Sequence, residues 1–217
     1  MNNFIDLSFP VYGTELYADH NHRLLAGISQ KFPTLHDLKE LSINTITGIP
    51  DRKGKIRLTR NSKLYLRLPV EAIAHVYMLA GEKLEIGEYT IELGNPELQT
   101  LKPIDTLRAR LVTIKGYQEP EEFLIAAERQ LQALGISANI GIPANDKREP
   151  KRLTLKIQKY TIVGFSVVVS DLNPDDSIKL QIHGLGGKRR LGCGVFYPNI
   201  PISRALKGNI NERETVS

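Results

Sequence analysis

The sequence predicts an α+β fold in which one order of elements, β-α-β-β-α-β, occurs twice. Three observations support this prediction. Segments that alternate apolar and polar residues, as strands do, are separated by segments with apolar residues at helical spacing. Residues 94–103 have no periodicity and contain two prolines, as a linker would. After this segment the same order starts again, so we expect two tandem ferredoxin-like halves.

The elements of the first half follow from local patterns. Alternation predicts strands over residues 3–9, 43–49, 63–69 and 83–93, the last of them either one strand or a hairpin. We expect a first helix between Asp19, which can cap it, and Pro33, which ends it. Residues 70–81 are expected to form a second, compact helix that ends at a glycine.

The second half repeats this order. Alternation predicts strands over residues 105–115, 136–142, 152–158, 162–169 and 194–198. Pro120 opens one helix, and Asn173 with Pro174 opens the other, because asparagine caps a helix well and proline suits its first position. We therefore expect a first domain at 1–94, a linker at 95–103, a second domain at 104–205 and a disordered tail at 206–217.

Composition excludes several classes of protein. The longest apolar runs are too short to cross a membrane, and the first residues lack the pattern of a signal peptide. One cysteine, Cys193, allows neither an internal disulfide framework nor a cysteine zinc cluster, so a cytoplasmic location is expected. The net charge is +5, and the basic residues cluster within 52–67, 147–159 and 188–190. Such clusters favour a polyanionic partner.

The most unusual stretch is "HGLGGKRRLGCGVFYPN", residues 183–199, where five glycines flank three consecutive cations. The glycines follow a helix and precede a strand, which does not fit a phosphate-binding lysine loop or a dinucleotide fingerprint. No small-molecule cofactor is therefore expected. Glycines alone could serve tight packing through positive φ. Combined with three cations, exposed backbone N–H groups would instead suit a phosphodiester chain.

This stretch resembles the glycine-rich loop of the CRISPR repeat-processing endoribonucleases, G-x-G-G-[KR]-[KR]-x-x-G-x-G-[VF]-F. These enzymes belong to the repeat-associated superfamily of RNA-binding proteins and carry the loop on the second of two ferredoxin-like (RRM-like) folds. The run "GGKRRLGCGVF" is similar to the subtype first defined in myxobacteria. Residues 9–36 resemble the first strand and helix of that subtype, including its aspartate-histidine pair, here Asp19-His20.

The resemblance implies a metal-independent endoribonuclease that cuts a repeat transcript at a hairpin. The 2′-hydroxyl attacks the neighbouring phosphorus and leaves a 2′,3′-cyclic phosphate and a 5′-hydroxyl. The reaction needs a base, an acid and cations for the phosphate. We expect His20 to be the preferred catalytic residue, with His22 helping or substituting and Tyr17 sharing proton transfer. The histidines do not show metal-ligand spacing, so no metal site is expected.

The expected RNA-binding residues are those of the glycine stretch and the two basic loops. They are Gly184, Gly186, Gly187, Lys188, Arg189, Arg190, Gly192, Arg52, Lys53, Lys147, Arg148, Lys151 and Arg152. The expected partner is a CRISPR repeat hairpin, with subunits of an effector complex as possible further partners. One alternative is a non-catalytic subunit that binds guide RNA in such a complex. Another is a regulatory protein that binds a small nucleotide.

Overall fold

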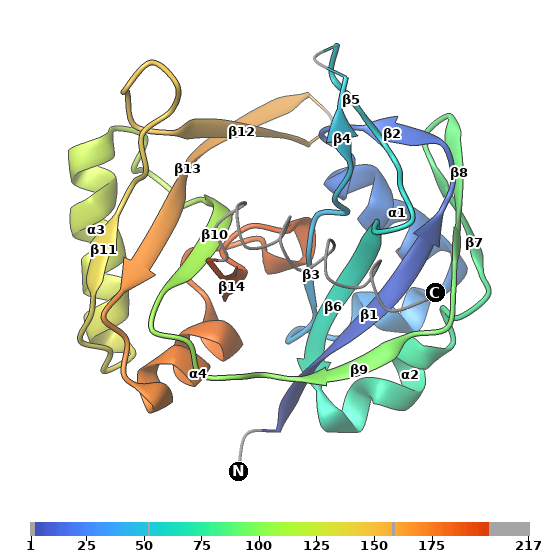
Figure 1. Cartoon of the computed structure of the whole chain (residues 1–217), viewed down its shortest axis with the longest axis horizontal. Helices are drawn as coiled ribbons and strands as arrows, with labels where there is room; N and C mark the ends of the chain where they lie inside the picture. The colour runs from blue at the N-terminus through green and yellow to red at the C-terminus, as the bar shows by residue number, and fades with distance from the viewer. Residues whose placement is uncertain (1–2, 52, 158, 200–217) are drawn as a thin grey trace, which may run out of the picture.

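The computed structural model describes residues 3–51, 53–157 and 159–199 and shows two α+β halves side by side (Figure 1). The main sheet of the first half has the order β3-β6-β1-β8-β7 and is antiparallel throughout. Its strands are β1 (Phe4–Tyr12), β3 (Ser42–Ile43), β6 (Lys63–Pro69), β7 (Lys83–Ile86) and β8 (Tyr89–Leu93). This is the strand order of a ferredoxin-like unit, as predicted.

Helices cover one face of this sheet. Along β1, Leu7 and Phe9 are fully buried on that face, as the alternation predicts. Helix α1 (Asn21–Lys31) contributes Leu24 and Ile28 to the same core. The other elements on this side are η1 (Pro33–His36), η2 (Val70–Ala72) and α2 (Ile73–Tyr77). The opposite face of the sheet is turned toward the second half.

Three predictions for the first half differ from the structure. Helix α1 has His20 at its N-cap position instead of Asp19. The helix expected over 70–81 is reduced to η2 and α2, because the Gly81 N–H donates to the Leu93 carbonyl and draws the chain toward β8. The strand expected over 43–49 pairs with the main sheet only at β3.

The chain between β3 and β6 forms a small arm. Its strands β4 (Ile49–Pro50) and β5 (Lys55–Arg57) pair with β2 (Glu15–Tyr17) in a separate three-stranded sheet. The basic loop of the first half is therefore the turn of this arm, which projects at the top of Figure 1. Pairing with β2 places the arm directly before α1.

The second half has the sheet order β11-β13-β10-β14, again that of a ferredoxin-like unit. Its strands are β10 (Leu107–Val112), β11 (Asn139–Gly141), β12 (Arg152–Ile157), β13 (Tyr160–Ser170) and β14 (Phe196–Pro198). Its helices are α3 (Pro120–Ala133), α4 (Pro174–His183) and the short η3 (Arg189–Leu191). The predicted cap of α4 is confirmed, since the Asn173 side chain accepts a hydrogen bond from the Asp176 N–H at 2.9 Å.

Two segments of the backbone extend from one half to the other. The segment expected to be an irregular linker contains β9 (Glu97–Thr100), which pairs with β1 before the chain crosses over. On the opposite side, the β12–β13 hairpin extends across to the arm (Figure 1). Arg67 of the first basic cluster is only 2% exposed and lies between the halves, so it does not face solvent as a cation that binds a polyanion must.

The expected disordered tail, 206–217, and the last residues of the expected second domain lie outside the described residues. Among the helices that are described, none has the length and apolar character to cross a membrane.

Candidate functional site

A hollow of about 510 Å³ lies where the arm, the start of α1 and β12 meet. Its lining comes from both halves and comprises Tyr17, Ala18, Asp19, His22, Arg23, Gly54, Thr154 and Lys156. Three of these side chains, His22, Arg23 and Lys156, can carry positive charge. The hollow therefore combines a titratable imidazole with cations on an open surface, an arrangement suited to acid–base chemistry on an anion.

Hydrogen bonds hold the wall of this hollow in place. The Asp19 carboxylate accepts a hydrogen bond from the backbone N–H of Lys156 at 2.8 Å, which fixes β12 against the start of α1. The Tyr17 hydroxyl donates to Glu88 at 2.6 Å, and the Arg23 guanidinium lies 4.7 Å from the centre of the Tyr17 ring. The side chain of Arg23 is thus positioned by an aromatic face.

His20 lies inside the protein, which its place in the first turn did not predict. Its side chain is 0% exposed. The Ile46 N–H donates to its Nε2 at 3.1 Å, so Nδ1 carries the proton and donates to the Tyr17 carbonyl at 2.8 Å. Both ring nitrogens are therefore engaged in joining α1 to the segment after β3.

The environment of His20 also opposes its protonation. Burial lowers the pKa of this imidazole to about 4, and the nearby Arg110 charge acts in the same direction. In this structure His20 is therefore a neutral imidazole with both ring nitrogens hydrogen-bonded, and its expected catalytic role stays a prediction. His22, two residues later, is half-buried and lines the hollow.

Tyr17 lies where it was expected, beside His22 in the hollow. The hydrogen bond from its hydroxyl to the Glu88 carboxylate raises its pKa. The hydroxyl proton of Tyr17 is thus engaged with a carboxylate, and a role of Tyr17 in proton transfer stays a prediction. Its observed contacts are those of a residue that orients Arg23.

The glycine segment packs closely against both halves. A side chain at Gly184 would meet the Gly194 carbonyl, and one at Gly194 would meet the Leu185 carbonyl. Gly192 has φ +74°, and a Cβ there would overlap the side-chain amide of Asn21. The same Asn21 amide donates to the Leu191 carbonyl at 2.8 Å. The glycines thus allow the segment to lie directly against the first turn of α1.

Most backbone N–H groups of this segment already have protein acceptors. Gly187 donates to the Thr113 carbonyl, Gly194 to the Leu111 carbonyl and Gly192 to the Arg189 carbonyl. The N–H of Gly186 donates to the Gln130 side chain at 2.7 Å. These amides are therefore not free to bind a phosphate, contrary to the expectation from glycine content.

The three cations of the segment differ in their surroundings. Lys188 is exposed, whereas Arg189 and Arg190 are half-buried. Arg189 donates to the Ile182 carbonyl at the end of α4, and burial lowers its pKa. This contact caps that helix. All three cations line a second hollow together with Lys39 and Leu25.

The two hollows are neighbours along α1. Leu25 lines the one beside the glycine segment, and His22 lines the other one turn earlier. Residues three positions apart on a helix lie about 5–6 Å apart at Cβ. The two hollows are therefore neighbours on the surface of α1.

The remaining predicted RNA-binding residues are dispersed. Lys53 is exposed beside Gly54 at the turn of the arm, next to the hollow, and Arg52 lies outside the described residues. Lys147, Arg148, Lys151 and Arg152 belong to the loop before β12 and to its first residue, at the far end of that strand (Figure 1). Of the cations of the 147–159 cluster, only Lys156, near the other end of β12, lines the hollow.

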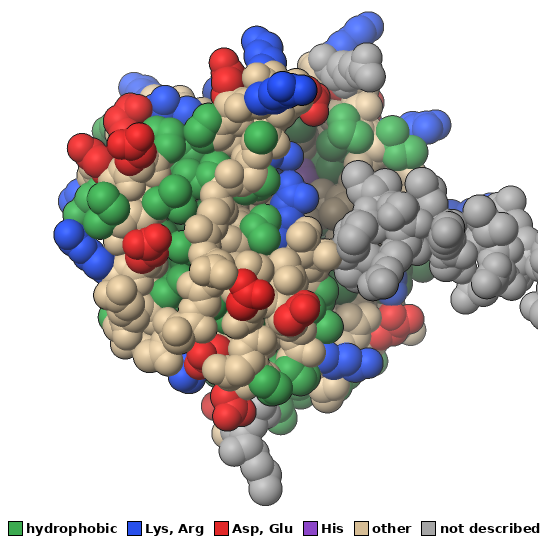
Figure 2. Space-filling view, turned by 60° about the vertical axis from the view of Figure 1, so that its left-hand side comes forward, with side chains coloured by type: hydrophobic (Ala, Val, Ile, Leu, Met, Phe, Trp, Pro, Cys, Tyr) green, Lys and Arg blue, Asp and Glu red, His purple; other side chains and the backbone are tan. Residues whose placement is uncertain are grey.

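Some residues of the site were missed by sequence analysis. Arg23 follows His22 directly and could have been identified from the same helical turn. Lys39 carried no local signal, and Lys156 was one of many lysines in a basic cluster. Figure 2 also shows Lys and Arg side chains in the recess between the halves. One hollow that has residues of both halves in its lining includes Arg110, Tyr65 and Tyr197. Among the residues described, no cluster of three His, Cys, Asp or Glu could hold a metal ion.

Comparison with known proteins gives one consistent family. The model of the family described as Cas6 Crispr matches residues 5–200. A curated protein of Myxococcus xanthus, named CRISPR-associated endonuclease Cas6, is 34% identical over 195 residues, which cover 90% of this chain and 81% of that protein.

Solved structures agree with this at the level of the fold. A Cas6-related protein of Pyrococcus furiosus has a TM-score of 0.63 at 14% identity, covering 89% of this chain and 98% of its own. A CRISPR associated protein Cas6 has a TM-score of 0.59, also at 14% identity, covering 91% of this chain and 99% of its own. At such low identity these similarities support the tandem ferredoxin-like fold alone.

Proposed function

The chain belongs to the Cas6 family, and on that premise we propose that it is a metal-independent endoribonuclease that cleaves CRISPR repeat transcripts at a hairpin. Cleavage leaves a 2′,3′-cyclic phosphate on one product and a 5′-hydroxyl on the other. The enzyme then stays bound to the mature guide RNA and can pass it to subunits of an effector complex.

His22 is the proposed acid–base group of this reaction. The attacking 2′-hydroxyl must lose a proton and the leaving 5′-oxygen must gain one, and an imidazole can serve either step near neutral pH. His22 is the histidine that lines the open hollow, whereas His20 holds α1 to the segment after β3 through its two ring nitrogens. His20 is thus a positioning residue in this proposal.

Arg23 and Lys156 are the proposed partners of the phosphate. The phosphorus gains negative charge on its equatorial oxygens as the 2′-oxygen attacks, and nearby cations stabilise that charge. Both side chains line the hollow with His22 and come from different halves. The active site is complete only when β12 lies against α1, as the Asp19–Lys156 hydrogen bond arranges.

Binding of the hairpin is assigned to the surface beside the glycine segment. Lys188, Arg190 and Lys39 surround the hollow there and would contact successive phosphates. An A-form stem is recognised mostly through its shape and backbone, which suits a surface with many cations and few aromatic rings. That the outer basic residues Lys53, Lys147, Arg148, Lys151 and Arg152 flank the stem stays a prediction.

The observation that carries the proposal is the position of His22. It shares a hollow with two cations and directly follows Asn21, which contacts the glycine segment. A test is to incubate the protein with repeat-derived hairpin RNAs, with and without EDTA. We expect cleavage in both conditions, and none when the nucleotide before the cut has a 2′-deoxyribose. Loss of cleavage with EDTA, or cutting of the 2′-deoxy RNA, would contradict the mechanism.

Substitution of single histidines tests whether His22 is the acid–base group. His22→Ala should lower the cleavage rate constant by about 10² to 10⁴ while RNA binding is kept. His75→Ala is a matched control, because His75 is an exposed histidine on α2, in the first half but outside both hollows. Full activity in His22→Ala would show that this residue is not the acid–base group.

The burial of His20 is the observation that favours the second candidate, a non-catalytic subunit that binds guide RNA. The histidine of the aspartate-histidine pair has no nitrogen left for a substrate. That candidate predicts tight hairpin binding with no cleavage of any repeat sequence. Detection of a cyclic phosphate product would exclude it.

A further inference from the structure

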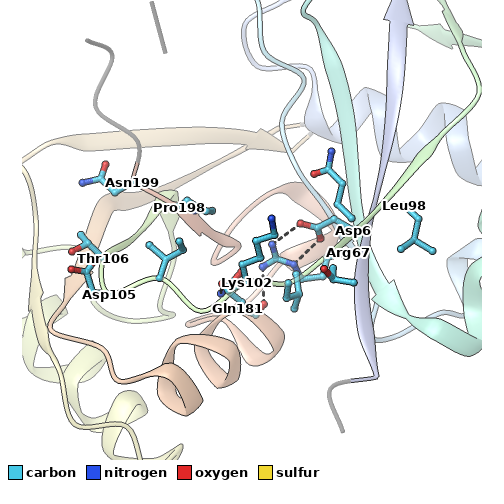
Figure 3. Close-up of a pocket in the computed structure, with 13 residues that line it drawn as sticks. Asp6, Arg67, Leu98, Lys102, Asp105, Thr106, Gln181, Pro198 and Asn199 are labelled. Carbon is cyan, nitrogen blue, oxygen red and sulfur yellow. Dashed lines mark hydrogen bonds and ion pairs between the residues drawn. The ribbon is translucent and has the colours of Figure 1, made fainter. Parts of the chain in front are cut away.

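We infer that Arg67 is a positioning residue that holds both ends of the glycine segment from the opposite half of the protein. This inference rests on the proposed role of that segment in RNA binding. Arg67 lies on β6 of the first half, and the glycine segment belongs to the second half. Figure 3 shows its guanidinium between Asp6 and the α4 end of the second half.

Asp6 fixes the orientation of the guanidinium. Asp6 and Arg67 are direct partners across β1 and β6. Nε of Arg67 donates to one carboxylate oxygen at 2.8 Å, and Nη2 donates to the other at 2.9 Å. This two-point contact leaves Nη1 directed toward the second half.

Nη1 of Arg67 binds two carbonyls that lie on either side of the glycine segment. One is that of Gln181 in the last turn of α4, at 2.8 Å, and the other is that of Phe196 at the start of β14, at 2.7 Å. The segment between α4 and β14 contains all five glycines and the three cations. A single side chain of the first half therefore sets the separation of the two ends of this segment.

The position of the Gln181 carbonyl at the end of α4 also favours a cation beside it. Carbonyls of the last helical turn lack intrahelical donors and carry partial negative charge, which a cation stabilises. Arg67 binds the Gln181 carbonyl and Arg189 binds the next one, that of Ile182. The Gln181 side chain donates to the Lys102 carbonyl at 2.9 Å, which ties the same turn to the crossing segment between the halves.

The consequence is a division of roles within the basic cluster of the first half. Arg67 contacts no RNA but places Lys188 and Arg190, which do so in the proposed function. An arginine is required, because a lysine ammonium cannot bind a carboxylate at two points and two carbonyls at once. Loss of Arg67 should therefore weaken RNA binding more than it slows cleavage of bound RNA.

The test compares Arg67→Met with the double variant Asp6→Asn/Arg67→Met. The single change leaves the Asp6 carboxylate without its partner and should lower the thermal midpoint. The double change removes both charges and should restore much of that stability. In both variants the Gln181 and Phe196 carbonyls lose their donor, so the positioning defect should remain.

Three measurements detect the loss of positioning of the glycine segment. Hydrogen exchange should accelerate at the Gly187 and Gly194 amides in both variants. The dissociation constant for a repeat hairpin should rise about tenfold, as expected for lost hydrogen bonds to a charged group. The single-turnover rate constant at saturating RNA should stay near the wild-type value, because the His22 hollow is not touched. The fraction of each variant that can bind RNA is measured by titration with RNA at stoichiometric concentrations. Partial unfolding then cannot be mistaken for weak binding.

Lys63→Met is the matched control. Lys63 lies on the same strand and pairs with Glu97 at 2.8 Å within the first half, so its loss should leave exchange in the glycine segment unchanged. Recovery of RNA binding together with stability in the double variant would overturn the inference, as would unchanged exchange in Arg67→Met. The exchange measurement needs no cleavage, so it remains decisive if the wild-type protein proves not to cut RNA.

Discussion

The carboxylate of Asp19 accepts a hydrogen bond from the backbone N–H of Lys156 at 2.8 Å, although 137 positions separate the two residues. This bond brings a strand of the second half to the first turn of α1. It explains why one hollow contains His22 from one half and Lys156 from the other. The contact uses the backbone of Lys156 and leaves its ammonium group for a ligand.

Lys156→Ala should separate these two functions. The backbone N–H remains, so the Asp19 bond and the thermal midpoint should be unchanged. The cleavage rate constant should fall by about tenfold, less than for a donor in a water-free site, because Lys156 is exposed. Asp19→Ala should lower both stability and cleavage. Equal cleavage by Lys156→Ala and wild type would remove Lys156 from the proposed active site.

His20 should make stability depend on pH. Its pKa is about 4 in the folded protein, compared with about 6.5 in an unfolded chain. The unfolded state therefore binds the proton first as the pH falls. The free energy of unfolding should decline between pH 6.5 and pH 4, by an amount of about 3 kcal/mol or less, and show no contribution from His20 above that range.

Urea unfolding of the wild type and His20→Gln across this pH range measures the effect. A glutamine amide offers one donor and one acceptor, as the neutral imidazole does, but it does not titrate. The difference in unfolding free energy between the two proteins should change below pH 6.5. Parallel curves would show that His20 is not kept neutral by the fold.

The glycine segment should tolerate a side chain at one position and not at another. Gly192→Ala places a Cβ on the Asn21 amide at φ +74°, so a stability loss of about 1–3 kcal/mol and weaker RNA binding are expected. Gly187 is the matched control, since a Cβ there meets no atom within 4 Å. Thermal denaturation of both variants decides the point. Equal stability of the two would mean that the segment does not pack on α1 as described.

Lys188 and Lys39 should contribute to the salt dependence of RNA binding. Each alanine variant should reduce the slope of log affinity against log salt by about 0.7–0.9, the value for one lost phosphate contact. Lys83→Ala is the control, because this exposed lysine lies on β7, outside both hollows. Filter binding at several salt concentrations gives the slopes. An unchanged slope in Lys188→Ala would place the RNA elsewhere.

Local sequence patterns predicted most helices and strands, but not how all of the strands pair. The strand at 63–69 and the helix starts at Pro120 and Pro174 agree with the structure, because alternation and capping depend on neighbouring residues. The arm and strand β9 were not predicted, since both form by pairing with β2 and β1 at a distance in sequence. Short strands of this kind have little pattern of their own.

Local sequence also does not determine the orientation of the predicted catalytic histidines. His20 and His22 are both near the start of α1, and nothing in their local sequence says which one faces the interior. The helix is rotated by its buried contacts, among them Asn21 against Gly192 and Leu24 in the core. Arg189 was likewise one of three equal cations in the sequence, and only its contact with Ile182 distinguishes it.

Sequence patterns alone predict the tandem α+β architecture, the place of the glycine segment after a helix and the family resemblance. These depend on periodicity and motif spacing, which are local. The enclosure of His20, the hollow shared by His22 and Lys156 and the contacts of Arg67 could be seen only in the folded protein. His20 bonds to Ile46 when the first half folds, whereas the sites at Lys156 and Arg67 form only when the two halves pack together. Partners this far apart in the chain leave no local pattern.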